Sequence, residues 1–84
     1  MSPVKRFVYL LRSVRRPDLP YTGITSDVRA RLNDHNSGVC RFTAADRPWE
    51  LRVVIEFADE EAAVAFEKYL KTGSGRAFFK RHFR

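Results

Sequence analysis

Apolar and polar positions along the chain follow two different periods, and these periods predict its secondary structure. Residues 7–11 are apolar at both alternating phases, which is typical of a strand covered on both faces, so a central strand is predicted over 5–13. Residues 21–24 are a short β-prone run after a turn with two prolines, which predicts a hairpin with the first strand. Residues 49–57 alternate with a period of two, apart from Val54, which predicts an antiparallel strand near a sheet edge with one buried and one largely polar face.

A first helix is predicted directly after the hairpin. Thr25 or Ser26 is expected to cap its start, with Asp27 in the first turn, and Gly38 is expected to end it in the left-handed conformation. At about 100° per residue, one face of this helix turns an arginine and a histidine towards the protein body beside two apolar anchors. The residues on this face are Val28, Arg31, Leu32 and His35.

Two further helices follow the last strand. The second is predicted from an N-cap at Asp59 to Gly73, and a third over 77–84 after a glycine-containing break. The buried stripe of the second helix is expected to contain Ala62, Ala63, Phe66, Tyr69 and Leu70. The element order β-β-α-β-α-α predicts an α+β fold in which a small three-stranded antiparallel sheet is flanked by about three helices. A chain of 84 residues has room for a single domain, over 1–84.

Positive charge is the strongest feature of the composition. Sixteen Lys and Arg residues against ten Asp and Glu residues give a net charge of +6. This excess favours polyanions through counterion release, so DNA is the expected partner. No apolar run approaches the ~20 residues that span a bilayer or resembles the core of a secretory signal, so no membrane association and a cytoplasmic location are expected. A lone cysteine excludes an internal disulfide.

Basic residues in two regions are candidates for contacting DNA. Arg41 and Arg47 lie in a turn-like segment before the last strand. Lys71, Arg76 and Lys80 lie in the C-terminal part of the chain. Solvated surface charge is the alternative explanation for each of them.

Five residues that could take part in catalysis also have ordinary structural explanations. Arg31 is explained by a packed stem with its charged head in water, and His35 by an interfacial position. Tyr9 and Tyr21 approach one another in the predicted hairpin and are explained by cross-strand packing. Glu67 is explained by an i,i+4 ion pair with a lysine, worth about 0.2 to 0.5 kcal/mol.

The order and spacing of these residues resemble the GIY-YIG nuclease family over nearly the whole chain. The resemblance rests on Phe7-Val8-Tyr9 and Tyr21-Thr22-Gly23, then on Arg31 and His35 in the next helix and Glu67 in a later one. The chain is similar in particular to small single-domain members related to the nuclease domain found at the N-terminus of an excinuclease.

The resemblance implies a role for each matching residue. Tyr9 and Tyr21 match the tyrosines of the two motifs, and Arg31 matches the helix arginine. His35 stands where related nucleases place a histidine or a tyrosine. Glu67 matches the carboxylate that holds a divalent cation, so Mg²⁺ or Mn²⁺ is the implied cofactor, with no organic cofactor.

Phosphodiester hydrolysis calls for these residue types on chemical grounds. It needs an activated water, neutralisation of the charge that grows on the phosphate, and help for the leaving oxygen. Glu67 with a cation can supply a Lewis acid, and Arg31 can meet the phosphate with its planar fork. A tyrosine then acts as base; Tyr21 is preferred over Tyr9 because it is nearer in sequence to the helix of Arg31. His35 is left to orient the water or to relay its proton.

The expected function is a metal-dependent endonuclease that hydrolyses phosphodiester bonds in DNA. Structure selectivity or weak sequence specificity is expected, because one small domain has few side chains for reading bases. The alternative is a weakly active or inactive nucleic-acid-binding module of the same fold, since the late asparagine of many family members has no counterpart here. In either case a protein partner is a candidate source of specificity.

Overall fold

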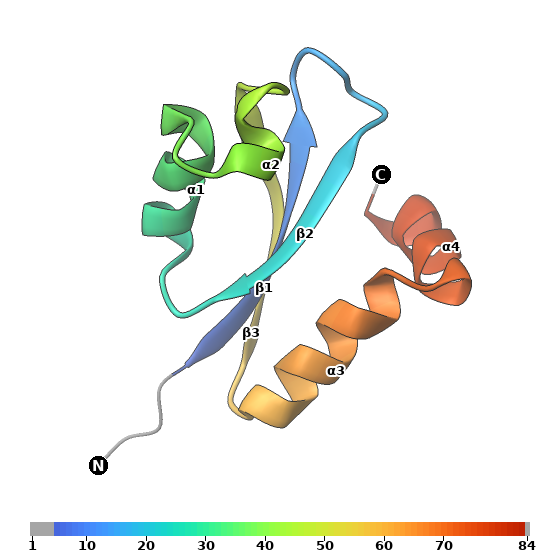
Figure 1. Ribbon diagram of the computed structural model, residues 1–84. Coiled ribbons are helices and arrows are strands. Elements are labelled where there is room, and N and C mark those ends of the chain that lie inside the picture. The colour runs from blue at the N-terminus through green and yellow to red at the C-terminus, as the bar shows by residue number, and fades with distance from the viewer. Residues whose placement is uncertain (1–4, 84) are drawn as a thin grey trace.

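Three antiparallel strands form the centre of the fold, and helices cover both faces of their sheet (Figure 1). The computed structural model describes residues 5–83, so Arg84, in the predicted third helix, lies outside the described residues. The elements are β1 (Arg6–Ser13), β2 (Pro20–Thr25), α1 (Val28–Ser37), α2 (Arg41–Ala44), β3 (Trp49–Phe57), α3 (Glu60–Leu70) and α4 (Gly73–His82). The strand order β2-β1-β3 confirms the predicted α+β fold, the central first strand and the hairpin, and α2 is an additional short helix. No helix within 5–83 is long and apolar enough to cross a membrane.

The central strand β1 is buried on both faces, because different helices pack against each. Val8 and Leu10 pack with the buried residues of α3 and with phenylalanines of α4. Tyr9 and Leu11 point the other way and pack with Trp49 and with apolar residues of α1. Figure 1 accordingly shows α1 and α2 on one side of the sheet and α3 and α4 on the other. The apolar residues at alternating positions of this strand therefore pack into two separate clusters, one on each face of the sheet.

A bulge in β3 changes which face its residues occupy. The register with β1 shifts between Leu10 and Leu11, where β3 contributes Arg52 as an extra residue. As a result, Trp49 joins the cluster on the α1 face, whereas Val53 joins the cluster on the α3 face. The predicted single buried face of this strand is wrong, because one inserted residue moves the side chains on either side of it to opposite faces.

The N-cap of helix α1 lies one residue after Ser26, the later of its two predicted positions. Asp27 is the N-cap, and its carboxylate accepts a hydrogen bond from the backbone N–H of Ala30 at 3.1 Å. The Thr25 hydroxyl instead accepts from the backbone N–H of Asp27 at 3.0 Å. The predicted cap at Thr25 or Ser26 is therefore wrong, because the threonine is used in the turn before the helix. Gly38 ends the helix with φ of 88°, as predicted.

Asp59 caps α3 as predicted, but the helix is shorter than expected. It ends at Leu70, not at Gly73. The Thr72 hydroxyl accepts a hydrogen bond from the backbone N–H of Gly75 at 3.1 Å and so caps α4, which begins at Gly73. The predicted break at the glycines is wrong, because the glycines form the first turn of α4.

The buried face of α3 is rotated relative to the predicted stripe. Ala63 and Leu70 are buried, whereas Ala62 and Tyr69 are exposed, which corrects the prediction for those two residues. At 100° per residue, Glu67 lies only roughly 60° from Leu70 around the helix. The rotation therefore brings a carboxylate to the border of the buried face, where its side chain keeps 15% of its exposure.

Gly75 is required where α3 and α4 meet. A Cβ at this buried residue would overlap the backbone carbonyl oxygen of Tyr69, whereas a Cβ at Gly73, in the same helical turn, would meet nothing within 4 Å. We expect Gly75→Ala to lower the free energy of unfolding by about 2 to 3 kcal/mol. Gly73→Ala is the matched control and should leave stability unchanged or raise it by up to about 1 kcal/mol. Urea denaturation of both variants measures the difference, and equal midpoints would contradict this account.

Candidate active site

A buried chain of side-chain hydrogen bonds runs from β1 through α1 to α2. The Tyr9 hydroxyl lies 2.9 Å from Nε2 of His35, and Nδ1 of His35 lies 2.8 Å from the Thr43 hydroxyl. That hydroxyl also donates to the carbonyl oxygen of Cys40 at 3.3 Å, so it accepts from Nδ1–H. Nε2 is then free to accept from Tyr9. All three side chains are buried, and neither imidazole nitrogen is left for a ligand.

The hydroxyl of Tyr9 reaches the edge strand because Gly23 makes room for it. The two residues pair in the hairpin register, and a Cβ at Gly23 would overlap the phenol. The sequence alone, in which Gly23 stands out only as part of the Tyr21-Thr22-Gly23 motif, did not reveal this requirement. A glycine within a β-prone run is the signal that could have indicated it, because such a glycine often marks a close approach of another group.

Tyr21 joins the same group from the edge strand, two residues before Gly23 and on the same face of the sheet. Its ring centroid lies 6.3 Å from that of Tyr9, 4.8 Å from that of His35 and 6.2 Å from that of Trp49. The predicted approach of the two tyrosines is confirmed. Tyr9 is buried, however, whereas Tyr21 keeps partial access to solvent.

Arg31 and Tyr9 influence one another electrostatically. Burial raises the pKa of Tyr9, and the nearby Arg31 guanidinium partly offsets this. The interaction with the phenol raises the pKa of Arg31 in turn. Burial, assisted by Arg31, lowers the pKa of His35. Tyr9 is thus held as a protonated donor to a neutral imidazole, while the half-exposed Arg31 head also pairs with Asp34 at 3.2 Å.

Three hydrogen bonds to Trp49 hold the segment around α2, the helix that carries Thr43. The Trp49 indole N–H donates to the Thr43 carbonyl oxygen at 2.8 Å. The Asn36 side chain accepts from the Trp49 backbone N–H at 2.6 Å and donates to its carbonyl oxygen at 3.0 Å. The sequence reasoning did not identify Thr43 or Asn36 as supporting residues, because their partners are brought close only by folding.

Glu67 reaches the edge of the sheet from the other side. Helix α3 contacts β2, and the Glu67 carboxylate lies 2.7 Å from Nζ of Lys71, so the predicted i,i+4 pair is present. Lys71, Arg76 and Tyr21 all line one cavity of about 230 Å³. Glu67 does not line this cavity itself and is linked to it through its ion pair with Lys71. Tyr9, Tyr21 and His35 lie against one another with Arg31 beside Tyr9, whereas Glu67 lies on α3, on the opposite side of the sheet from α1.

A divalent cation would be held here by one carboxylate. Among residues 5–83 no three His, Cys, Asp or Glu residues are grouped closely enough to form a metal site. Mg²⁺ is commonly bound through one or two carboxylates, with water and substrate phosphate oxygens completing its octahedron. The hard oxygen donors of Glu67, whose side chain is 15% exposed and pairs with Lys71, fit that mode of binding.

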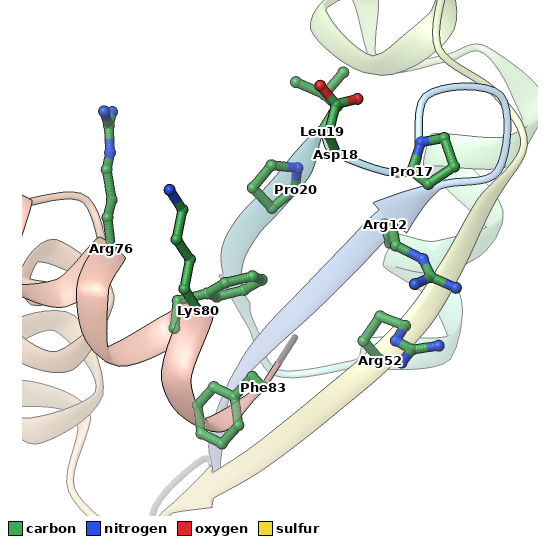
Figure 2. A pocket seen from close by; sticks show the side chains of 10 residues that line it. Arg12, Pro17, Asp18, Leu19, Pro20, Arg52, Arg76, Lys80 and Phe83 are labelled. Atoms are coloured by element: carbon green, nitrogen blue, oxygen red, sulfur yellow. The ribbon is translucent and has the colours of Figure 1, made fainter.

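A larger basic cavity of about 890 Å³ adjoins this hollow (Figure 2). The two cavities share Pro20, Arg76 and Phe79. The charged residues that line the larger cavity are Arg12, Asp18, Arg52, Arg76 and Lys80. Figure 2 shows Arg76 and Lys80 rising from α4 on one side, and Arg12 and Arg52 on the strands opposite. Three of the predicted DNA contacts, Lys71, Arg76 and Lys80, therefore border two connected hollows.

The other two predicted DNA contacts lie on the α1 face of the sheet. Arg41 and Arg47 are exposed on α2 and on the loop after it. The Arg47 guanidinium donates to the Ala44 carbonyl oxygen at 2.7 Å, which holds it close to α2. Cationic side chains thus lie on both sides of the tyrosine cluster.

Comparison with known proteins gives one family. The profile described as GIY-YIG catalytic domain matches residues 5–81. A structure-specific endonuclease subunit slx1 from Talaromyces marneffei is 43% identical over 74 residues, a match that covers 79% of this chain and 19% of that protein. A UPF0213 protein from Streptococcus pneumoniae is 38% identical over 68 residues, covering 80% of this chain and 67% of that protein. The chain thus spans about a fifth of the fungal relative.

The lowered pKa of His35 predicts a pH dependence of stability. Below the ordinary histidine pKa of about 6.5, His35 becomes protonated in the unfolded chain but stays neutral in the folded chain, where its pKa is lower. The stabilisation that His35 contributes to the free energy of unfolding is therefore fully present above about pH 6.5. It is lost as the pH falls towards the lower pKa of His35 in the folded chain.

Urea denaturation at about pH 7.5 and about pH 5.5 measures this effect. We expect wild type to lose more stability on acidification than His35→Gln, although the variant is less stable at both values because it breaks two buried hydrogen bonds. His82→Gln removes an exposed histidine and is the matched control. Identical losses in wild type and His35→Gln would contradict the prediction.

Proposed function

Because this chain belongs to the GIY-YIG catalytic domain family, we propose that it is a metal-dependent endonuclease that hydrolyses phosphodiester bonds in DNA. The observation that carries the proposal is the half-buried Tyr21 resting on the buried Tyr9–His35 pair, with Arg31 beside them. A phenol, a guanidinium and a carboxylate at one sheet edge are the groups that hydrolysis of a phosphodiester requires.

Tyr21 is the residue that activates the water. It is the tyrosine of the cluster that solvent and substrate can reach, whereas Tyr9 is buried and its pKa is raised. Tyr9 and His35 act as positioning residues, because the imidazole uses both nitrogens within the protein. Thr43 holds the tautomer in which His35 accepts from Tyr9.

Arg31 binds the scissile phosphate. Its guanidinium is half-exposed and is positively charged at every relevant pH. It can therefore donate hydrogen bonds to two phosphate oxygens while its aliphatic stem stays close to the surface of α1. Charge that develops on the phosphate in the transition state is then stabilised by a group that is already in place.

Glu67 would hold the divalent cation, Mg²⁺ or Mn²⁺, which would supply Lewis-acid stabilisation of the phosphate and of the leaving oxygen. Lys71, Arg76 and Lys80 contact the DNA backbone from the two hollows that they line.

The substrate is branched or otherwise irregular DNA, not a particular sequence. The fungal relatives are named as subunits of structure-specific endonucleases, and this chain matches 19% of one and 14% of another. The basic cavity presents cations to a backbone, and such contacts position DNA without reading its bases. A protein partner supplies further specificity.

A binding module without catalysis is the second candidate, and the Lys71–Glu67 contact favours it. An ammonium group 2.7 Å from the carboxylate occupies the position that a divalent cation would take. This alternative predicts DNA binding but no nicking of supercoiled plasmid with Mg²⁺ or with Mn²⁺. Nicking that depends on either ion and stops with EDTA would exclude it.

Glu67→Gln tests the proposed cation ligand. The amide keeps the size of the side chain but loses the charge, so we expect nicking to fall by at least about 10²-fold, the scale for loss of one charge-stabilising group. DNA binding measured by fluorescence anisotropy should be retained. Glu61→Gln, in the exposed first turn of the same helix, is the matched control and should nick like wild type. Wild-type nicking by Glu67→Gln would show that the ligand is assigned wrongly.

Arg31 is tested by two substitutions of different chemistry. We expect Arg31→Ala to lower kcat by about 10² to 10³-fold with a small change in KM, because its contact strengthens in the transition state. Arg31→Lys should recover only part of this loss, since an ammonium lacks the planar fork. Arg29→Ala removes an exposed arginine from the same helix and should change kcat less than twofold. Full activity of Arg31→Lys would argue against a two-oxygen contact.

A further inference from the structure

Phe42 is a large apolar side chain that the fold leaves in solvent. It is 97% exposed, and Val39 on the same segment is 73% exposed. The ring packs against nothing in the described structure, so folding gains no stability from it. A polar residue at this position would serve the fold equally well.

The exposure of Phe42 does not come from a loose segment. The next residue, Thr43, is buried and bonded to His35, and the Trp49 indole donates to its carbonyl oxygen. The Asp46 carbonyl oxygen accepts from the Ser13 hydroxyl at 2.7 Å. The short helix α2 is therefore a fixed platform that presents the ring outwards at little cost in conformational entropy.

Exposed cations lie on the same segment as the ring. Arg41 precedes it in the sequence, and Arg47 lies at the end of the same segment with its guanidinium held by the Ala44 carbonyl oxygen. The acidic residue of this segment, Asp46, is already paired with Arg16 at 3.3 Å. An aromatic face between cationic groups matches the two chemical parts of a nucleotide, a flat base and an anionic phosphate.

We propose that Phe42 stacks on an unpaired base of the DNA strand bound at the active site, with Arg41 and Arg47 contacting the phosphates on either side of it. The proposal rests on the proposed nuclease function and adds a source of structure selectivity. Bases in continuous duplex are covered by their neighbours, so only an unpaired or displaced base offers its face to the ring. Phe42 directly precedes Thr43, whose buried contact with His35 ties the helix that carries the ring to the tyrosine cluster.

Binding assays in EDTA test the proposal separately from cleavage. The probes are a blunt duplex and the same duplex with a short single-stranded tail, both followed by fluorescence anisotropy. We expect Phe42→Ala to weaken binding of the tailed duplex by about 5- to 20-fold and binding of the blunt duplex by less than twofold. Phe42→Tyr and Phe42→Trp should bind both probes like wild type. Phe42→Leu should behave like Phe42→Ala, because it is apolar but cannot stack. Val54→Ala, at an exposed apolar residue of β3, is the matched control.

A fluorescent base analogue gives a direct readout of stacking. 2-Aminopurine placed in the tail next to the duplex should be quenched by wild type and by Phe42→Tyr, but not by Phe42→Ala.

Three results would overturn the proposal. Wild-type affinity of Phe42→Leu for the tailed duplex would show that stacking is not involved. A dimer of the wild type that Phe42→Ala converts to a monomer would show that the ring is a contact between two copies of the chain. Equal binding of both probes by Phe42→Ala and wild type, in a protein that nicks plasmid normally, would remove this role of Phe42 and leave the nuclease function standing.

Discussion

The hydrogen-bond chain from Tyr9 through His35 to Thr43 is the constraint on which the rest of the α1 face depends. It joins β1, α1 and α2, three elements that share few other polar contacts. Buried polar groups destabilise a protein unless they are paired, and within residues 5–83 every buried side-chain nitrogen and oxygen has a hydrogen-bond partner. Satisfying these groups fixes the two rings and the tautomer at once. The interactions that complete the fold on this face therefore also arrange the site.

The site lies at the free edge of β2, and this position explains how residues from both faces of the sheet meet. Gly23 lets the Tyr9 ring reach the edge from the central strand. Tyr21 lines the hollow from the edge strand, and Lys71, the ion-pair partner of Glu67, lines it from the end of α3. An interior strand would be hydrogen-bonded on both sides and could not border such a hollow. In the proposed function, the unpaired edge, which is a risk for aggregation in other proteins, is the place where substrate approaches.

Most of the fold follows from local patterns in the chain, and the errors have identifiable causes. The central strand, the hairpin, the edge position of β3 and the helix stop at Gly38 depend on periodicity and turn residues, and the structure confirms them. The face of Trp49 was wrong because a bulge at Arg52 is created by pairing with β1, which no local pattern contains. The stripe of α3 was wrong for Ala62 and Tyr69 because the rotation of a helix is set by its neighbours.

The sequence by itself determined the family, the order of the elements apart from the short helix α2, and the identity of the tyrosines, the arginine, the histidine and the glutamate, because these depend on residue type and spacing. Only the tertiary structure decided the surroundings of each of them. It buried Tyr9 and left Tyr21 partly accessible to solvent. It also engaged both nitrogens of His35 in hydrogen bonds and turned Glu67 to the border of the face of α3 that packs on the sheet. The burial and the hydrogen-bond partners of these side chains depend on residues distant in the chain, such as Thr43 and Gly23. The spacing of residues along the sequence therefore does not predict them.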